Sequence, residues 1–390
     1  MQIEQINLQT HFGGGEVYTA FLTRALDRLG IRSTLYVHPK AQFWTQLGLP
    51  KSTQIQTMTQ HDALPQRLEQ TRVQQTNAQP RWLLSHGPLA QSVLQSLART
   101  PGAYLCTAIA HMPVQGRNPQ VFAGHDMVFP VSEWVRTGLL AAGIKTWHEP
   151  LYGVADLTQR ASAQPEPLLY QSPYDWDQRK VRDRLLGLLE TLSSPLRQAW
   201  RAPQVLTKKP GLTLGIVSRL TPIKQLPQLF TQLLPILLRY PEFNLEIVGS
   251  GGYASVRDLQ RVLKPLGSRV RFWGQQRDIK AVYAQLDYLL SGLPEKEALG
   301  LNIIEAQSCN LPVLAVNAPP FSETVAQEQT GYLYRDPRQD QGADFAQLLT
   351  RLIAAPSRLQ PASAHAHLAR FSADALCERL RAVQRWVVAQ

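Results

Sequence analysis

Two carboxylates flank a glycine in the stretch EKEALGLNIIEA, which covers residues 295–306. Seven residues separate Glu297 from Glu305, and Gly300 lies in that interval. The stretch follows the apolar run DYLLSG and continues into an apolar helical pattern, so we predict a strand, a loop and a helix start in that order. A helix N-terminus presents free N–H groups and a positive dipole end, and it therefore favours a phosphate group.

Glu305 has two interpretations at this point. Asn302 is a good N-cap, and Glu305 three positions later would complete a capping box that serves only the helix. A carboxylate one turn inside the helix can also accept two hydrogen bonds from a ribose diol, while Glu297 in the loop can reach a sugar hydroxyl. Asn310 is predicted to end the helix in the left-handed conformation.

Two cations follow the apolar run GLTLGIV. In SRLTPIK, Arg219 and Lys224 come where a parallel strand is predicted to end, and ligands bind at that end of open α/β sheets. A guanidinium and an ammonium group there suit a diphosphate. The alternative is that both are ordinary solvated loop charges.

A glycine-rich segment, HFGGGE, follows the first apolar run and opens a helical pattern. It is similar to a phosphate-binding glycine loop, but it is not G-x-G-x-x-G, and no acidic residue follows the second predicted strand. A dinucleotide oxidoreductase is therefore disfavoured. Close approach of an anionic ligand to the backbone of Gly13, Gly14 and Gly15 stays open.

Two histidines follow predicted strands. His111 comes after LCTAIA and is a candidate sugar contact or proton partner, whereas His86 in SHGP is predicted to be structural. Asp175 and Asp177 in DWD have the spacing to share a divalent ion. They also stand at a predicted helix start, where acidic residues are favoured by the helix dipole, so no metal site is predicted.

Apolar runs alternate with amphipathic helical patterns in both halves of the chain. This β-α-β alternation predicts an α/β protein with parallel, doubly wound sheets in two similar halves. We predict four segments: an N-terminal Rossmann-like domain over 1–155, a linker with inserted amphipathic helices over 156–207, a C-terminal Rossmann-like domain over 208–365, and a C-terminal helix over 366–390.

The inserted segment contains one amphipathic helical pattern, with Asp175 as its expected N-cap. Its apolar stripe consists of Val181, Leu185, Leu188, Leu189 and Leu192, and four basic residues lie outside the stripe: Arg179, Lys180, Arg182 and Arg184. One interpretation is that the helix packs on a domain and its charges are solvated. The other is that its basic side contacts a membrane or an anionic acceptor.

Composition excludes several classes of protein. The net charge is +11, but basic and acidic residues are spread over both halves, so no nucleic-acid arm is predicted. A diffuse positive field suits anionic small molecules or an anionic membrane surface. The three cysteines show neither metal spacing nor a disulfide framework. Without a signal sequence or membrane-length apolar run, the expected location is the cytoplasm, with a peripheral place on the inner face of the plasma membrane kept open.

Taken in order, the glycine loop, the strand before His111, and the motifs VSRLTPIKQLPQLF, LEIVGSGG, VRFWGQ, E-x7-E and LPVLAV resemble the retaining nucleotide-sugar glycosyltransferases of family 4. The likeness covers nearly the whole chain except about 157–207. It implies the GT-B fold: two Rossmann-like domains with parallel sheets facing across a cleft, and a C-terminal helix over 366–390 that packs back toward the N-terminal domain. By the same resemblance, the domain over 1–155 would be the acceptor-side domain and the domain over 208–365 would bind the nucleotide sugar.

The resemblance implies a role for each matching residue. Arg219 and Lys224 would hold the diphosphate, Glu305 the ribose and Glu297 the donor sugar, with His111 beside that sugar. The remaining donor-binding positions are Gly13, Gly14, Gly15, Gly249, Gly274, Ala298, Leu299, Gly300, Leu301 and Asn302. The donor would be a UDP-, GDP- or ADP-sugar, the acceptor a glycan, a lipid-linked glycan or a small molecule, and no metal or other cofactor is expected.

The chain departs from the family pattern at four positions. Ser218, Gln225 and Asn310 stand where glycine is common, and Pro320 replaces the glycine that usually precedes the acidic residue matching Glu323. A catalytically inactive homologue that binds nucleotide sugars or acts as a scaffold is therefore the alternative. The four charged residues that the chemistry needs are all present, which favours an active enzyme, and the resemblance implies a role in polysaccharide biosynthesis.

Overall fold

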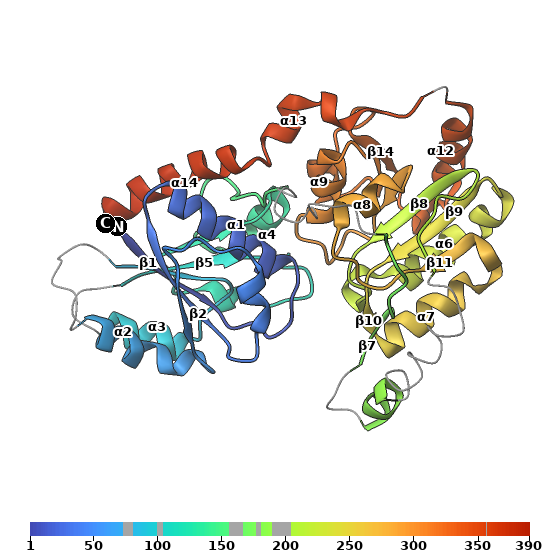
Figure 1. The fold of residues 1–390 in the computed structure, drawn as a ribbon. Helices are drawn as coiled ribbons and strands as arrows, with labels where there is room; N and C mark the ends of the chain where they lie inside the picture. The colour runs from blue at the N-terminus through green and yellow to red at the C-terminus, as the bar shows by residue number, and fades with distance from the viewer. Residues whose placement is uncertain (73–80, 100–103, 156–166, 177–180, 189–203, 356) are drawn as a thin grey trace. The chain divides into compact units, whose positions relative to one another are not determined.

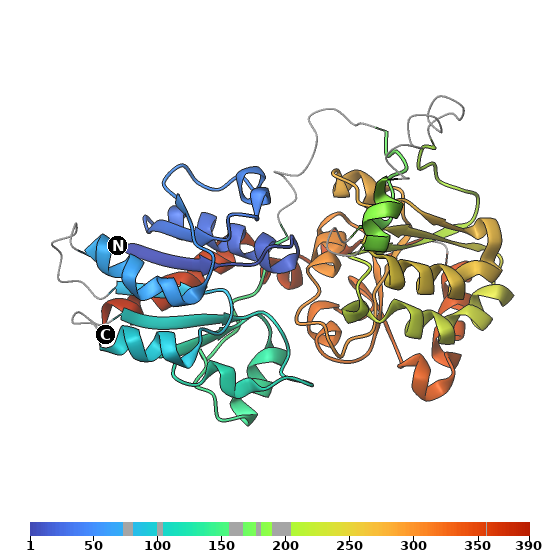
Figure 2. The same ribbon diagram turned by 90° about the horizontal axis from the view of Figure 1, so that it is seen from below.

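The computed structural model describes residues 1–72, 81–99, 104–155, 167–176, 181–188, 204–355 and 357–390 (Figure 1). The chain forms two compact units. The first consists of Met1–Asp156 together with Ala369–Gln390, and the second of Leu157–Leu368. Both termini therefore belong to the first unit (Figure 2).

The first unit contains a parallel sheet in the order β3-β2-β1-β4-β5-β6. Its strands are β1 (Gln2–Asn7), β2 (Arg32–Val37), β3 (Gln54–Thr57), β4 (Arg81–Ser85), β5 (Tyr104–Ala110) and β6 (Met127–Pro130). Five of the six residues of β1 and of β2 are buried. Strands covered on both faces have near-continuous buried runs, as the sequence of these segments indicated.

Helices lie on both sides of this sheet. They are α1 (Gly14–Arg28), α2 (Leu64–Arg72), α3 (Gln91–Ala98), α4 (Glu133–Ala141) and α14 (Ala373–Val388). Figure 1 shows α1 and α14 on one side and α2 and α3 on the other. The C-terminal helix α14 belongs to the first unit, as predicted: Cys377 Sγ lies 3.8 Å from the Ala25 carbonyl oxygen of α1, and the Trp386 ring packs against Phe129 and Trp147.

The second unit repeats the design with a parallel sheet in the order β11-β9-β8-β12-β13-β14. Its strands are β8 (Leu212–Val217), β9 (Phe243–Val248), β11 (Val270–Phe272), β12 (Tyr288–Leu290), β13 (Val313–Val316) and β14 (Gly331–Tyr334). One large apolar cluster fills this unit, drawing on all but one of these strands and on the helix that follows β8.

The helices of the second unit follow its strands along the chain. They are α6 (Leu226–Arg239), α7 (Tyr253–Leu263), α8 (Ile279–Ala284), α9 (Leu301–Ser308), α10 (Phe321–Thr324), α11 (Pro337–Asp340), α12 (Ala343–Ala354) and α13 (His365–Ala369). In α6, the residues Leu226, Leu229, Phe230, Leu233, Ile236 and Leu237 are buried, which is the spacing of one helix face.

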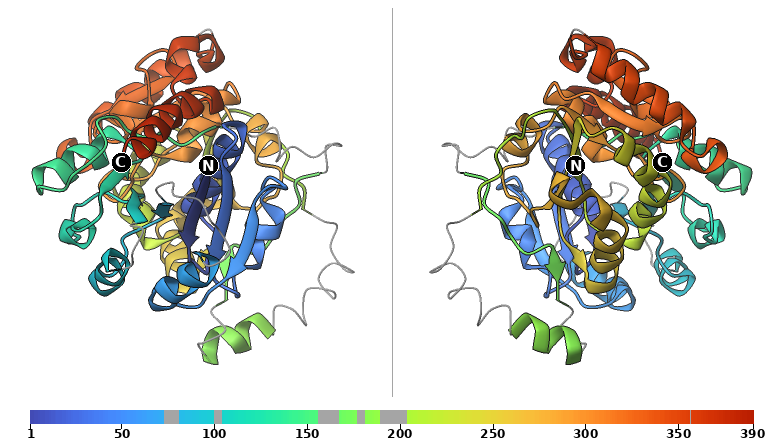
Figure 3. Two further views of the ribbon diagram at one scale, coloured as in Figure 1. Left: turned by 90° about the vertical axis from the view of Figure 1, so that its left-hand side faces the viewer. Right: turned by 90° about the vertical axis from the view of Figure 1, so that its right-hand side faces the viewer.

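The inserted segment differs in part from its prediction. Asp175, the expected N-cap, lies in the two-residue strand β7 (Tyr174–Asp175), which pairs with β10 (Gly251–Gly252). A helix is described over 181–188, and Figure 3 shows it at the periphery of the second unit. Asp177, Arg179, Lys180, Leu189 and Leu192 lie outside the described residues.

Candidate functional site

The second sheet has a topological switch point between β8 and β12. From these two neighbours the strand order runs outward in opposite directions, and ligands bind beyond the carboxyl ends of strands at such a point. The loops that follow the two strands meet there. A Cβ on Gly292 would lie 2.6 Å from the Lys224 carbonyl oxygen, and Asn302 donates through Nδ2 to the Val217 carbonyl oxygen at 3.1 Å.

Lys224 and Glu297 are brought into direct contact at this place. The Lys224 ammonium donates to Glu297 Oε2, and the two side chains are 22% and 19% exposed. The Glu297 amide is fixed in turn, because it donates to the Pro294 carbonyl oxygen at 2.9 Å. Lys224, predicted to hold a phosphate, and Glu297, predicted to contact a sugar hydroxyl, therefore lie side by side and partly exposed at the carboxyl-terminal edge of the sheet.

Arg219 follows the end of β8, in the loop that also carries Lys224, but among the described residues it has no acidic partner like that of Lys224. Its side chain is exposed, and within the described part of the chain it forms no ion pair. The structure thus brings Lys224 and Glu297 together and leaves the guanidinium of Arg219 available at the same loop. An exposed cation without an acidic partner is suited to an anion that arrives from solvent.

Gly249 and Gly274 have a reason to be glycine within the fold itself. At Gly249 φ is +136°, and a Cβ there would lie 1.9 Å from the Ser218 carbonyl oxygen. At Gly274 a Cβ would lie 2.5 Å from the Gln171 carbonyl oxygen, and the two glycines share a 2.7 Å hydrogen bond from the Gly249 amide to the Gly274 carbonyl. These close backbone approaches hold the loop that carries Arg219 against the end of the neighbouring strand β9.

The predicted N-cap of the helix after β12 is wrong by two residues. Gly300, with φ of +85°, is the N-cap of α9, and Asn302 lies inside its first turn. No side chain caps this helix start. Ala298, Leu299 and Gly300 are buried just ahead of it, and Leu301 begins it. Because Gly300 can adopt the left-handed conformation, the chain turns tightly and leaves the first helical N–H groups without a side-chain acceptor.

This correction removes one interpretation of Glu305. A capping box needs the acidic residue three positions after the N-cap, and Glu305 stands five positions after Gly300. The carboxylate is buried and accepts a hydrogen bond from the Tyr283 hydroxyl at 3.4 Å. Tyr283 also donates to the Asn302 carbonyl oxygen at 3.2 Å. The Tyr283 hydroxyl of α8 therefore lies within hydrogen-bonding distance of both the Glu305 carboxylate and the first turn of α9.

Sequence reasoning missed Tyr283 and the pair that anchors the loop before α9. Tyr283 lies on the apolar face of the predicted helix IKAVYAQL. A tyrosine on a buried face needs a partner for its hydroxyl, and this requirement could have identified it from the sequence.

The second omission is Arg338, whose guanidinium binds both Glu295 of the loop and Asp336 at the start of α11. This pairing joins segments more than forty residues apart in sequence.

The first unit has its own switch point, between β1 and β4. Gly13, in extended conformation, is the N-cap of α1, and no side chain caps that helix either. Gly14 and Gly15 form its first turn, and a Cβ on Gly15 would meet nothing within 4 Å. The glycine loop thus presents open backbone at the position where the sequence predicted approach of an anion.

The two histidines lie in contact behind this loop. His86 Nδ1 is 3.4 Å from His111 Nε2, and the His86 ring nitrogens also contact Thr19 and Gln5. Burial lowers the pKa of His111 to about 4 and lowers the pKa of His86 well below its usual value. Both imidazoles are therefore neutral at neutral pH, and a histidine that is neutral can accept or donate a single hydrogen bond at each nitrogen.

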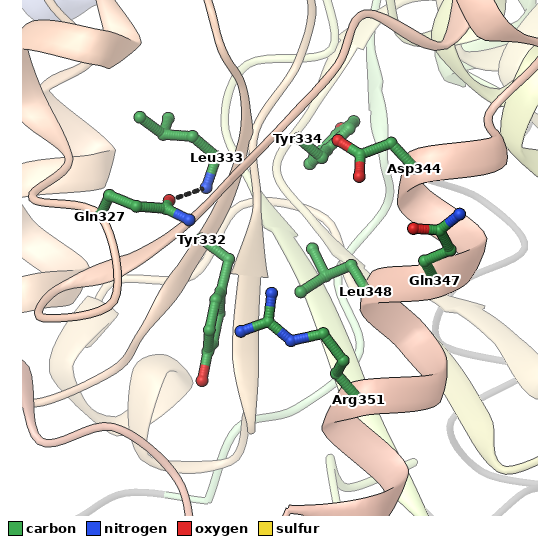
Figure 4. A pocket seen from close by; sticks show the side chains of 8 residues that line it. All are labelled: Gln327, Tyr332, Leu333, Tyr334, Asp344, Gln347, Leu348 and Arg351. Carbon is green, nitrogen blue, oxygen red and sulfur yellow. Dashed lines mark hydrogen bonds between the residues drawn. The ribbon is translucent and has the colours of Figure 1, made fainter.

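Among the described residues, no group of three or more His, Cys, Asp or Glu side chains is arranged to hold a metal ion. In the same residues, no helix has the length and hydropathy that a bilayer crossing requires. A small hollow between β14 and α12 is lined by Gln327, Tyr332, Arg351 and their neighbours (Figure 4). None of its lining residues belongs to the predicted donor site, and Arg351 there is already paired with Glu328.

Comparison with known protein families gives a match to Glycosyl transferases group 1 over residues 211–355. Curated relatives include the D-inositol 3-phosphate glycosyltransferase of Rhodococcus jostii, which is 31% identical over 42% of this chain and 39% of that protein. A second is the GDP-mannose-dependent monoacylated alpha-(1-6)-phosphatidylinositol monomannoside mannosyltransferase of Corynebacterium glutamicum, 30% identical over 44% of this chain and 48% of that protein. The chain thus spans less than half of the length of either relative.

Solved structures match over the full length of the chain. HepE of Anabaena, solved in complex with UDP and glucose, has a TM-score of 0.68 at 18% identity and covers 99% of both chains. The sucrose-phosphate synthase of Thermosynechococcus elongatus has a TM-score of 0.67 at 16% identity, covering 100% of this chain and 99% of that one. At these identities the matches establish a shared fold with two parallel-sheet units, as the sequence resemblance predicted.

Proposed function

We propose that the chain is a GT-B glycosyltransferase that transfers a sugar from a nucleoside-diphosphate sugar to an acceptor hydroxyl. The proposal is supported by the match to Glycosyl transferases group 1 over residues 211–355 and by the fold shared with the solved structures. The observation that carries the proposal is the contact between Lys224 and Glu297 at the switch point of the second sheet. Opposite charges there match the two parts of such a donor: a phosphate for the ammonium and a sugar hydroxyl for the carboxylate.

The donor's diphosphate would be neutralised by the chain's own groups. The exposed Arg219 and Lys224 both lie in the loop that follows β8, and the uncapped N-terminus of α9 adds oriented N–H groups. Positive groups aimed at charge that develops on a leaving group lower the barrier, and removal of one such donor costs about 2.7–4 kcal/mol. We therefore propose that the reaction requires no metal ion, with Glu305 binding the ribose.

The reaction is proposed to retain the anomeric configuration, as the family resemblance implies. The bond between the anomeric carbon and the diphosphate oxygen breaks, and the acceptor oxygen forms the new bond on the same face. The acceptor's proton passes to the departing phosphate oxygen. This route needs no enzymic nucleophile, and in it Glu297 orients the sugar while His111 contacts a substrate hydroxyl.

The expected experiment is a turnover assay with UDP-, GDP- and ADP-sugars, followed by Glu297→Gln. The variant keeps a side chain of the same shape and leaves Lys224 free, so nucleotide binding is retained while transfer falls at least about a hundredfold. Glu328→Gln is the matched control, because Glu328 forms an ion pair with Arg351 outside the site. Full activity of Glu297→Gln would remove its role, and absence of any turnover or hydrolysis would favour a catalytically inactive homologue.

We further propose that the acceptor is lipid-linked and that the protein lies peripherally on the cytoplasmic face of a membrane. The support is the helix over 181–188, where Asp183 is 3% exposed and Gly187 faces the Trp176 ring, while Val181, Leu185 and Leu188 are 57–63% exposed. The helix thus turns its apolar stripe away from the unit on which it packs. An apolar stripe on a protein with a charge of +11 is suited to an anionic bilayer.

Vesicle sedimentation tests this part. The protein is expected to pellet with phosphatidylglycerol vesicles and not with phosphatidylcholine vesicles, and Leu185→Asp should weaken the binding. Leu238→Asp is the matched control, because Leu238 is an exposed leucine on α6. Equal binding of both variants, or no binding to either kind of vesicle, would contradict the membrane contact.

A further inference from the structure

A group of buried polar side chains lies behind His111 and has no place in the reaction proposed above. Gln5 on β1 is completely buried, and its amide nitrogen donates to Thr23 Oγ1 at 3.1 Å and to Ser33 Oγ at 3.0 Å. The orientation of this amide is determined by Thr23, whose own proton goes to the Thr19 carbonyl oxygen at 2.8 Å. Thr23 can then only accept from Gln5, so the Gln5 nitrogen is its partner at 3.1 Å, while Gln5 Oε1 lies farther from Thr23 Oγ1, at 3.4 Å.

The amide oxygen of Gln5 meets His86. The distance from Gln5 Oε1 to His86 Nε2 is 3.1 Å. Because a carbonyl oxygen only accepts hydrogen bonds, His86 Nε2 carries the proton. The ring is neutral, since burial and the neighbouring His111 lower its pKa well below the usual value. His86 Nδ1 is therefore unprotonated and accepts hydrogen bonds.

Two groups lie near His86 Nδ1: the hydroxyl of Thr19 and the ring of His111. Thr19 Oγ1 is 2.9 Å from this nitrogen and 2.9 Å from the Gly15 carbonyl oxygen, so its one proton has two acceptors, and it accepts from Asn7 Nδ2 at 3.0 Å. Threonine hydroxyls on helices commonly bond to the preceding turn in this way. His111 Nε2 is the second group, at 3.4 Å, and it carries a proton because its lone pair would otherwise face the lone pair of His86 Nδ1.

The ring geometry agrees with a hydrogen bond between the two imidazoles. Their planes differ by only 17° and their centroids are 5.6 Å apart. With 3.4 Å between the nearest nitrogens, the rings must meet edge to edge rather than face to face. The Tyr18 ring stands perpendicular to His111 at 4.9 Å and fixes its plane. Since burial also keeps His111 neutral, its one proton resides on Nε2.

We propose that Gln5 and His86 are positioning residues that hold His111 in the Nε2–H tautomer, so that its Nδ1 accepts a hydrogen bond from a substrate hydroxyl. Within the described residues, no group hydrogen-bonds to this Nδ1 atom. The identity of the hydroxyl rests on the proposed function, whereas the tautomer does not. His111 then selects a ligand with a neutral hydroxyl at that position and disfavours a carboxylate, whose lone pairs would face the lone pair of Nδ1.

The tautomer can be measured directly by NMR of the intact protein labelled with ¹⁵N-histidine. Long-range proton–nitrogen correlation at pH 7 is expected to show His111 and His86 as neutral Nε2–H tautomers, each assigned by the loss of its signals in His111→Asn or His86→Phe. A His111 signal from the Nδ1–H tautomer, or from a charged imidazolium, would overturn the proposal. The result does not depend on turnover, so it stands apart from the proposed function.

A double-mutant cycle separates positioning from a general structural role. His86→Phe keeps a ring but removes the acceptor for His111, and kcat is expected to fall about tenfold with nucleotide affinity unchanged. An asparagine at position 111 presents an amide oxygen near the place of Nδ1 and has no tautomer. In the His111→Asn background, His86→Phe should therefore change kcat by less than about twofold. Equal losses in both backgrounds would show that His86 is only structural.

His125→Phe is the matched control for this cycle. His125 is also buried, and it accepts from the Leu89 amide and contacts the Phe122 carbonyl oxygen, outside the group behind His111. This variant is expected to leave the His111 tautomer unchanged. A shift of the His111 signals in His125→Phe as large as that in His86→Phe would mean that the tautomer responds to any loss of packing, which would contradict a specific role for His86.

Discussion

At the scale of single residues, two departures from the family pattern place a non-glycine residue in the left-handed backbone conformation. Gln225 and Asn310 stand where the family commonly has glycine, and both adopt the left-handed conformation, with φ of +51° and +59°. The left-handed end of α9 at Asn310 confirms the prediction from sequence. Asparagine tolerates this conformation better than glutamine, so the strain is greater at Gln225, the N-cap of α6.

Gln225→Gly is expected to stabilise the protein by about 0.5–1 kcal/mol. The gain has two sources: relief of the left-handed strain exceeds the added chain entropy of glycine, and the buried Oε1 of Gln225 has no hydrogen-bond partner in the described residues. Chemical denaturation gives the free energy of unfolding. Gln228→Gly, on the exposed side of the same helix, should instead cost about 1 kcal/mol. A loss of stability in Gln225→Gly would show that the site does not strain the backbone.

At the scale of elements, the strands and helices that surround the site were predictable and the contacts between them were not. The runs GLTLGIV and DYLLSG have the apolar composition of buried parallel strands, and they form β8 and β12. The capping of α9 was predicted wrongly because Asn302 is a better intrinsic cap than Gly300, and the tight turn after the buried residues Ala298 and Leu299 overrides that preference.

Contacts between distant elements leave little trace in a single sequence. Arg338 on α11 and Glu295 after β12 carry ordinary surface residue types, and nothing in their spacing relates them. Glu295 also lies two residues before Glu297, so its partner helps to fix the loop that presents the proposed sugar-binding carboxylate. The strand β3 and the helices α2 and α3 were missed for a related reason, because their segments are short or rich in polar residues.

Arg338→Met is expected to loosen this loop without unfolding the unit. The pair is about one-third exposed, so the cost in stability is at most about 1 kcal/mol. Turnover should fall about three- to fivefold while the affinity for a nucleoside diphosphate stays the same. The measurement is steady-state kinetics beside nucleotide titration, with Arg351→Met as control for loss of an exposed ion pair. Unchanged turnover would mean that the loop keeps its geometry without Arg338.

At the scale of the whole molecule, the buried histidines make stability depend on pH. Burial lowers the pKa of His111 to about 4 from the ordinary value of 6.5, and the pKa of His86 is lowered as well. The unfolded chain therefore binds more protons than the folded chain below about pH 6.5. Stability is complete above that pH and is lost as the pH falls toward the folded-state value.

The free energy of unfolding should consequently fall between pH 7 and pH 5, by about 2 kcal/mol for His111 alone. His111→Gln removes this contribution, so its loss of stability over the same interval should be smaller by about that amount. Denaturant titrations at several pH values measure both proteins. Identical pH dependence in the two would show that His111 titrates normally in the folded state.

The central claim is that a nucleoside diphosphate binds at the switch point of the second sheet, where Lys224 meets Glu297. Isothermal titration with UDP, GDP and ADP tests it most directly, on the wild type, on Lys224→Met and on the control Arg351→Met. At least one nucleotide should bind the wild type and the control equally, and Lys224→Met should weaken that binding about ten- to hundredfold, as expected for loss of a charged hydrogen bond. Failure of all three nucleotides to bind, or full affinity of Lys224→Met, would contradict the account.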